Sequence, residues 1–273
     1  MSPAGDTPDS RAPDDYRFRF GGIERLYGRR ALNAFRQSHV AIVGLGGVGS
    51  WAAEALVRSG IGTLTLIDMD DICVSNTNRQ LHALEGQYGR TKTDAMAQRL
   101  QAINPHADIR IHFGFLTTGN VADLITADMT GVVDAIDSVK AKAALIAHCQ
   151  RRKIPIVCAG GAGGQMDPSQ IRVGDLSKTT QDPLLAKVRN MLRRDYGFSR
   201  NPKRRFGIEA VYSLEQLTYP ASDGEVCLQK PVTEGPVRLD CASGFGAASP
   251  VTASFGFFAA ARVLNRIARR ATL

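Results

Sequence analysis

The sequence contains no CxxC pair and no long apolar segment free of charge. Its five cysteines are odd in number and widely spaced, which argues against a structural zinc site, because such sites need paired thiols at short spacing. No secretory signal is recognisable near the N-terminus, and free thiols without one predict a reducing, cytoplasmic location. The most apolar stretch, residues 245–264, contains Pro250 and Arg262. It is therefore predicted to be a packed core helix, with no stable membrane insertion.

Acidic residues are fewer than basic ones, with 26 Asp and Glu against 34 Lys and Arg, which gives a formal net charge of +8. Between Lys178 and Arg205 there are nine Lys or Arg and two Asp, so this segment alone carries seven net positive charges. A small substrate such as ATP does not require that charge density, and it indicates a polyanionic partner such as a nucleic acid. A solvated basic face is the simpler alternative.

A length of 273 residues, 44% of them hydrophobic, suits one large α/β domain. We expect a disordered tail over residues 1–15, which are rich in Asp, Pro, Ser and Gly, and a single domain over residues 16–273. Within that domain we distinguish a nucleotide-binding core (36–164), a basic insert (about 178–205) and a C-terminal apolar helix (about 245–270).

Short apolar runs alternate with helical stretches between residues 39 and 159. The expected strands are 39–44, 63–68, 108–113, 131–136 and 154–159. The expected helices between them are 48–60, 91–103, 121–127 and 140–151. This alternation predicts an α/β fold with a Rossmann-like, doubly wound and mostly parallel sheet. Beyond residue 160 the expected elements are a strand on another edge (170–176), a helix (183–196) and a strand (208–213).

A glycine-rich turn, GLGGVG at residues 44–49, lies between the first expected strand and helix. Glycines permit the tight turn and let phosphate oxygens approach the N–H groups at the positive end of the helix. The candidate nucleotide-binding glycines are Gly44, Gly46, Gly47 and Gly49. Asp68 ends the next strand, where it can accept hydrogen bonds from a ribose. These features alone fit NAD as well as ATP.

The loop after Asp68 gathers polar and charged side chains that a dinucleotide site rarely needs. They are Asp70, Asn76, Asn78 and Arg79, and Lys92 opens the next helix. Nicotinamide chemistry develops no new phosphate charge, whereas phosphoryl or adenylyl transfer does. Because arginine and lysine neutralise that charge best in a dry site, the cluster favours ATP over NAD.

Two acids, Asp134 and Asp137, stand at the end of the fourth expected strand. The carboxyl ends of the strands converge on the ligand site of such a sheet. Asp137, just past the strand, is our candidate for holding Mg²⁺ through one carboxylate. Asp134 is its rival, and a helix-capping or structural role is the alternative for either.

Five ordered motifs resemble the ATP-dependent activating family that includes ThiF-like, MoeB-like and ubiquitin-activating proteins. They are RFGGIERLYG, the GxGGxGS loop, DMDxxxxSNxNRQ, Lys92 and DAIDS, spread over residues 19–164. The resemblance implies that Asp68 binds the ribose and Asp137 the Mg²⁺. It implies phosphate contacts for Asn78, Arg79 and Lys92, with Asp70 beside them in the nucleotide site. It also implies a homodimer in which Arg25 reaches into the partner subunit's site; a solvated surface charge is the alternative for Arg25.

Within that family the chain is most similar to the tRNA threonylcarbamoyladenosine dehydratase branch, almost end to end. The shared stretches include GGVGSWAAEALVRSGIG, CAGGAGGQMDPSQI and DCASGFGAASPVTASFGF. The resemblance implies ATP-dependent, ligase-like cyclisation of N6-threonylcarbamoyladenosine next to the tRNA anticodon, with tRNA and sulfur-transfer proteins as partners. The main alternative is activation of a ubiquitin-like sulfur carrier. Enzymes of that kind generally bear paired CxxC motifs, which this chain lacks.

The implied reaction transfers AMP from ATP to the threonyl carboxylate, and a nucleophile within the modified base then expels AMP. It needs no covalent cysteine. The expected catalytic residues are Arg25, Arg79, Lys92 and Asp137. Cys241 is the candidate for a thioester if that account is wrong, although a packed thiol is the simpler interpretation. An NAD(P)-dependent oxidoreductase and a nucleotide-sensing module are the alternatives from other classes.

Overall fold

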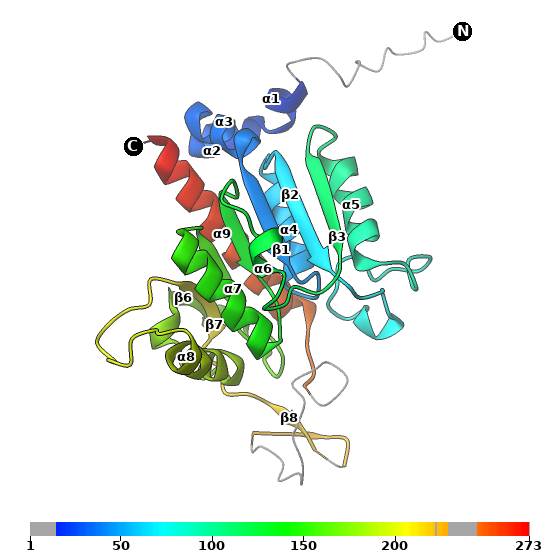
Figure 1. Ribbon diagram of the computed structural model, residues 1–273. Helices are drawn as coiled ribbons and strands as arrows, with labels where there is room; N and C mark the ends of the chain where they lie inside the picture. The colour runs from blue at the N-terminus through cyan, green and yellow to red at the C-terminus, as the bar shows by residue number, and fades with distance from the viewer. Residues whose placement is uncertain (1–14, 222, 229–244, 273) are drawn as a thin grey trace.

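A seven-stranded sheet forms the centre of the protein, which the computed structural model describes over residues 15–221, 223–228 and 245–272 (Figure 1). Its strands are β1 (His39–Val43), β2 (Thr63–Asp68), β3 (Asp108–Phe113), β4 (Gly131–Asp134), β5 (Ile156–Ala159), β6 (Ile171–Asp175) and β7 (Glu209–Ser213). They lie in the order β3-β2-β1-β4-β5-β7-β6, and all neighbours are parallel except β6, which pairs antiparallel with β7 at one edge. The prediction of a Rossmann-like, mostly parallel sheet is confirmed.

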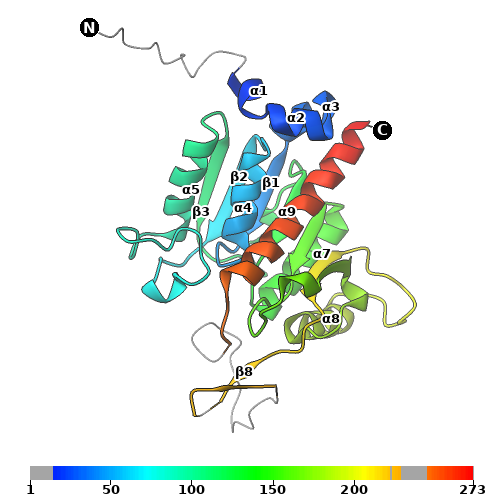
Figure 2. The ribbon, with the colours of Figure 1, turned by 180° about the vertical axis from the view of Figure 1, so that it is seen from behind.

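Helices cover both faces of this sheet (Figures 1 and 2). They are α1 (Asp15–Arg19), α2 (Gly21–Tyr27), α3 (Arg29–Gln37), α4 (Gly49–Arg58), α5 (Lys92–Ile103), α6 (Val121–Leu124), α7 (Val139–Arg152), α8 (Pro183–Asp195) and α9 (Ser249–Thr272). Short 3-10 turns lie at Val74–Asn76, Pro168–Gln170 and Leu176–Lys178, and β8 (Tyr219–Pro220) pairs with β9 (Val226–Cys227). One face carries α4, α5 and α9, the other carries α6, α7 and α8, and α1 to α3 gather where the strands begin.

Each face of the sheet has its own apolar core. Side chains alternate along a strand, so β1 sends Ile42 into the core shared with Phe255 of α9 and Val43 into the core shared with Leu145 and Leu185. Every residue of β1 is buried, as expected for a central parallel strand covered on both sides.

Helices α5 and α8 begin at side-chain caps. The Thr91 hydroxyl accepts a hydrogen bond from the Asp94 N–H (3.2 Å) at the start of α5. The Asp182 carboxylate accepts one from the Leu185 N–H (2.8 Å) at the start of α8, where Pro183 takes the first helical position. Such caps satisfy N–H groups that have no partner inside the helix. They explain why the predicted starts near residues 91 and 183 agree with the structure.

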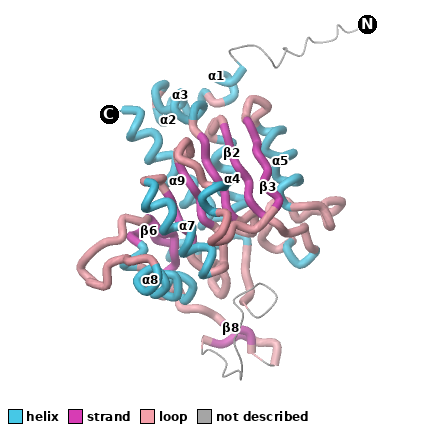
Figure 3. Tube along the Cα trace, viewed as in Figure 1, coloured by secondary structure: helices cyan, strands magenta, loops and turns pink. Residues whose placement is uncertain are grey.

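The strand order reverses at β1. This strand pairs with β2 on one side and with β4 on the other, so Val43 lies between Ile67 and Asp134. The loops after β1 and β4 therefore leave the sheet in opposite directions at its carboxyl end. Open α/β sheets bind ligands between two such loops, and we call this place the crevice. Figure 3 shows loops gathered at this end.

The C-terminal apolar segment forms a helix that packs on the sheet. Helix α9 buries Val251, Phe255 and Ala259 and contacts α3 and α4. None of the described helices is long and apolar enough to cross a membrane. At the other terminus, Asp15 begins α1, and residues 1–14 of the predicted tail lie outside the described residues.

Candidate active site

The glycine loop packs against its surroundings at three positions and is open at one. Gly44 has a φ of +89°, and a Cβ there would lie 2.9 Å from the Ala135 carbonyl oxygen; a Cβ on Gly49 would lie 1.8 Å from the Gly44 carbonyl oxygen. A Cβ on Gly47 would press on Arg79 at 3.1 Å, whereas nothing lies within 4 Å of the corresponding position on Gly46. Gly46 therefore leaves the space through which a phosphate can approach the backbone.

Asp68 is fixed against this loop at the end of β2. Its carboxylate accepts hydrogen bonds from the Leu45 N–H (2.6 Å) and the Asp70 N–H (2.8 Å). An ionised carboxylate can accept about four hydrogen bonds, so Asp68 can still receive ribose hydroxyls. The structure brings Asp68 and the glycine loop together as the sequence predicts.

Arg79 lies under the glycine loop and is 8% exposed. Its guanidinium donates to the Ser75 carbonyl (3.0 Å) and to the Asn78 side-chain oxygen (2.9 Å). Its own carbonyl accepts a hydrogen bond from the Trp51 indole (3.1 Å). These bonds use only part of the guanidinium's five donors, which leaves donors for a phosphate.

Asn78 is tied to the segment that leads into α9. Its side-chain amide donates to the Ala247 carbonyl (2.7 Å), and the Ser249 hydroxyl donates to the Asn78 carbonyl (2.7 Å). Residues about 170 positions apart in the chain thus close one side of the site. Neither this contact nor the Trp51 contact was predictable from the sequence, because both join segments that are distant in the chain.

Lys92 opens α5 with its side chain almost wholly buried. Its ammonium lies 2.7 Å from the Asp70 carboxylate, and its backbone N–H donates a hydrogen bond to the Asp70 carbonyl (3.0 Å). Nearby, burial and the Lys92 charge lower the pKa of His82 to about 4, so His82 is neutral at pH 7. The site thus holds two buried cations, Lys92 and Arg79, and no cationic histidine.

The structure separates the two acids that the sequence left as rivals. Asp134 is fully buried, and its carboxylate forms an ion pair with Lys142 at 2.8 Å. Asp137 is exposed, and its side chain has no hydrogen-bond or ion-pair partner within the part of the chain that is described. It follows Ala135, whose carbonyl oxygen packs against Gly44. Asp134 is therefore closed off from any ligand, whereas Asp137 remains accessible beside the glycine loop.

A magnesium ion fits this arrangement only together with a phosphate ligand. Among the described residues no group of three or more His, Cys, Asp or Glu side chains could hold a metal alone. Mg²⁺ commonly binds proteins through one or two carboxylates and completes its shell with substrate phosphates and water. A single accessible carboxylate at Asp137 matches that donor set.

Arg25 lies at the other end of the molecule from the glycine loop. It is exposed on α2, which packs on α3 before the chain enters β1, whereas the glycine loop follows β1 (Figure 2). The structure therefore does not bring Arg25 to the site of its own subunit. Cys241 lies outside the described residues.

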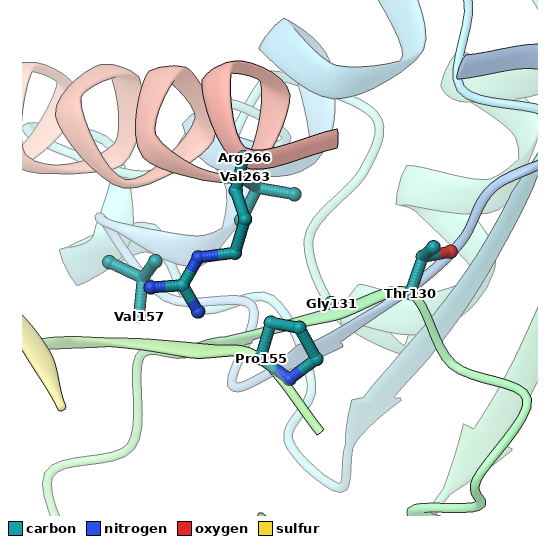
Figure 4. Close-up of a pocket in the computed structure, with 6 residues that line it drawn as sticks. All are labelled: Thr130, Gly131, Pro155, Val157, Val263 and Arg266. Carbon is teal, nitrogen blue, oxygen red and sulfur yellow. The ribbon is translucent and has the colours of Figure 1, made fainter. Parts of the chain in front are cut away.

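A small hollow between α9 and the starts of β4 and β5 is no rival site. Thr130, Gly131, Pro155, Val157, Val263 and Arg266 line it (Figure 4). Three of these residues have apolar side chains, and the hollow lies where the strands begin, away from Asp68 and Lys92. The crevice at the carboxyl end is thus the candidate active site.

The fold and the site are those of an ATP-dependent activating enzyme. The chain belongs to the ThiF family, which matches residues 22–272. It is 55% identical to the tRNA threonylcarbamoyladenosine dehydratase of Escherichia coli over 258 residues, 94% of this chain and 96% of that protein. The Haemophilus influenzae protein of the same name is 52% identical over 260 residues, 94% of this chain and 96% of that one. A crystal structure of the E. coli protein, TcdA, in complex with ATP matches with a TM-score of 0.84 and 49% identity, covering 95% of this chain and 97% of that one.

Proposed function

We propose that this protein uses ATP to dehydrate N6-threonylcarbamoyladenosine in tRNA, by adenylylating the threonyl carboxylate so that the modified base closes into a ring. The observation that carries the proposal is a pair of buried cations at the glycine loop. Arg79 packs against Gly47, and Lys92 is linked to the loop through Asp70 and Asp68. Relatives whose names state this activity match the chain over 94% of its length. The enzyme is ligase-like in its use of ATP, and we place it in the cytoplasm.

The residues of the crevice divide the binding of ATP among them. Asp68 accepts hydrogen bonds from the ribose, and the N–H groups of the glycine loop at the start of α4 receive the phosphates. Asn78, Arg79 and Lys92 contact the same phosphates. A buried ammonium and guanidinium act in a medium of low dielectric constant, where their attraction for phosphate is stronger than in water.

The reaction joins two anions, which is why positive charge is needed. A threonyl carboxylate oxygen attacks the α-phosphorus in line, the bond to the bridging oxygen breaks, and pyrophosphate leaves. A nucleophile of the modified base then attacks the acyl carbon, and AMP leaves with the former carboxylate oxygen. The substrate loses one water in the two steps. Lys92 and Arg79 stabilise the charge that develops in the first step.

Asp137 would hold Mg²⁺ through its accessible carboxylate. When bound, the ion supplies Lewis-acid stabilisation of the phosphate oxygens. The support for this role is the position of Asp137 just after Ala135, which packs on Gly44. Asp134 cannot take the place of Asp137, since the Asp134 carboxylate is fully buried in an ion pair with Lys142.

The basic insert gives a surface suited to the RNA backbone. Four exposed cations lie on the loop after α8: Arg200, Lys203, Arg204 and Arg205. The Asp175 carboxylate anchors the end of this loop by accepting hydrogen bonds from the N–H groups of Phe206 (3.0 Å) and Gly207 (2.7 Å). A fixed cluster of exposed cations binds phosphates without reading sequence.

The enzyme would act as a homodimer in which Arg25 completes the site of the partner subunit. Phe18 and Leu26, near Arg25, are 90% and 75% exposed, and Phe257, stacked edge-on to Trp51 beside the glycine loop, is 45% exposed. Exposed apolar side chains of this size favour a protein interface. In a two-fold dimer, α2 of one subunit would pack near the start of α9 of the other, and this contact would bring Arg25 to the partner's crevice.

Mass spectrometry of tRNA nucleosides after incubation with ATP and Mg²⁺ tests the proposal. We expect the mass of threonylcarbamoyladenosine to fall by one water, with one AMP and one pyrophosphate formed per ring, and no change with Lys92→Ala. AMP transfer to a carrier protein ending in Gly-Gly, with no change in tRNA, would instead support activation of a sulfur carrier. Nicotinamide turnover without pyrophosphate would support an oxidoreductase.

A further inference from the structure

The fully buried ion pair between Asp134 and Lys142 has no role in the chemistry described above. Both side chains are 0% exposed, and the Lys142 ammonium lies 2.8 Å from one Asp134 carboxylate oxygen. The other oxygen has no hydrogen-bond partner among the described residues. Removing two charges from water is costly, and neutral, well-packed replacements are often at least as stable. Stability is therefore a poor explanation for the pair.

The pair instead links the two ends of the loop that carries Asp137. Asp134 ends β4, Lys142 lies in the first turns of α7, and residues 135–138 connect them. The Lys142 ammonium donates to the Asp134 carbonyl (3.3 Å), and the Ile136 N–H donates to the Asp134 carboxylate (3.1 Å). The loop is thus held from both ends through a single carboxylate.

The same loop is fixed to the glycine loop on its other side. The Ala135 N–H donates to the Val43 carbonyl (2.9 Å), and the Ala135 carbonyl packs so closely on Gly44 that no Cβ fits there. These contacts leave Asp137 as the one acid of the loop with a free carboxylate. Its position relative to the phosphate site therefore depends on the bonds that Asp134 and Lys142 make.

We propose that the Asp134–Lys142 pair is a positioning device that holds the loop 135–138 so that the Asp137 carboxylate faces Mg²⁺ bound with the ATP phosphates. Neither residue touches the substrate; both act through Asp137. The inference rests on the metal-binding role proposed for Asp137. It predicts that breaking the pair weakens metal binding while ATP binding without metal stays the same.

The double variant Asp134→Asn/Lys142→Met tests this with little change in shape. Asparagine retains an oxygen that can accept from the Ile136 N–H, methionine fills the space of the lysine chain, and no uncompensated charge is created at this pair. Asp182, which also lies in the field of Lys142, keeps its bonds from the N–H groups of Leu185 and Gly161. Lys140→Met, at an exposed lysine of the same helix, is the matched control.

Mn²⁺ is the probe, titrated by electron paramagnetic resonance in the presence of an ATP analogue with a methylene bridge between the α and β phosphates. We expect the Mn²⁺ dissociation constant to rise about tenfold in the double variant, as in Asp137→Asn, and to stay at the wild-type value in Lys140→Met. Fluorescence of Trp51, the one tryptophan of the chain, reports binding of the analogue without metal, which should be unchanged. Asp134→Asn/Lys142→Gln, which leaves no unpaired charge and keeps a donor and an acceptor across the pair, provides a milder variant if the first double variant does not fold, and we expect a smaller rise.

Three results would overturn the inference, and they differ in what they imply for the proposed function. Wild-type Mn²⁺ affinity in the double variant, with weakened affinity in Asp137→Asn, would show that the pair does not position Asp137 and would leave the proposed function intact. Wild-type affinity in Asp137→Asn itself would remove both the metal assignment and the inference. Equal loss of analogue binding with and without metal would indicate a general structural defect and would also contradict it.

Discussion

The Lys92 ammonium and the Asp70 carboxylate lie 2.7 Å apart, with the lysine side chain 6% exposed and the aspartate side chain 56% exposed. The buried partner is thus the cation, and the solvent-exposed partner is the anion. A bound phosphate would compete with Asp70 for the same ammonium. Lys92 is therefore held at the carboxyl end of the sheet without being neutralised by a buried acid, as the proposed role in adenylyl transfer requires.

Asp137→Asn should lower Mg²⁺-dependent turnover by about 100-fold or more and leave the fold intact, because an exposed side chain contributes little to the core. Pyrophosphate release at several Mg²⁺ concentrations measures it. Asp123→Asn, at an exposed acid of α6, is the control and should behave as wild type. Near-normal release by Asp137→Asn would refute the metal assignment, and Asp70 would then be the acid to test.

Arg25→Ala and Lys92→Ala should each be nearly inactive as homodimers, whereas a mixture of the two should recover activity. In a heterodimer one of the two sites regains both wild-type side chains if Arg25 acts across the interface. Random exchange of subunits should thus restore about a quarter of wild-type activity. AMP formation after subunit exchange is the measurement. A heterodimer verified by differential tagging that stays inactive would show that Arg25 acts within its own subunit or only structurally.

Replacing Arg200, Lys203, Arg204 and Arg205 with Ala should weaken tRNA binding far more than ATP binding. Each lost phosphate contact should flatten the dependence of log affinity on log salt by about 0.7 to 0.9. The matched control replaces four exposed arginines on α3, β3 and the end of α9, namely Arg30, Arg110, Arg269 and Arg270, which changes the net charge equally.

Affinity for tRNA across a salt series distinguishes the two fourfold variants. If the loop after α8 tracks the RNA backbone, only its variant changes the slope, and it does so similarly for all substrate tRNAs. An equal change of slope in both variants, relative to wild type, would show that the effect depends on net charge alone. An unchanged slope in the loop variant would remove it from the RNA-binding surface.

Glu54→Gln should lower the free energy of unfolding by about 1 to 3 kcal/mol at pH 7. The Glu54 side chain is 7% exposed. It pairs with Arg58 on its own helix, α4 (2.7 Å), and joins α4 to α5 through Arg99 (2.8 Å). Burial raises the pKa of Glu54, but the bonds from the two arginines outweigh it and the pKa is lowered. A lowered folded-state pKa gives stability above the unfolded-state pKa that is lost as the pH falls through the folded value.

The stability difference between wild type and Glu54→Gln should therefore be full at pH 7. It should shrink as the pH falls below the ordinary glutamate pKa of about 4.3 towards the lowered folded-state pKa. Thermal unfolding midpoints over this pH range measure it. Glu85→Gln, at an exposed glutamate, should show no such dependence. A difference that stays constant down to pH 3 would mean that the ion pairs do not stabilise the fold.

Much of the fold was predictable because its signals are local. Apolar runs of four to six residues alternate with helical stretches, and the strands β1 to β5 and helices α4, α5 and α7 lie within a few residues of the predicted bounds. The glycine loop and Asp68 were predictable too, since a tight turn between a strand and a helix has a fixed spacing. A lysine in an apolar face was a signal that was missed: Lys142 shares a helical face with Leu145, Ile146 and Cys149.

The sequence by itself determined which residues follow each strand, because local periodicity and turn chemistry depend on neighbours in the chain. Only the tertiary structure decided what those residues can do. Asp134 and Asp137 are three residues apart and indistinguishable in the sequence. In the structure Asp134 is buried in an ion pair with Lys142, whereas Asp137 is exposed. The packing of α7 on β4 makes that choice, as the packing of α2 before β1 places Arg25 far from its own crevice. Burial and partnership arise from contacts between distant segments, so no pattern of neighbouring residues could have fixed them.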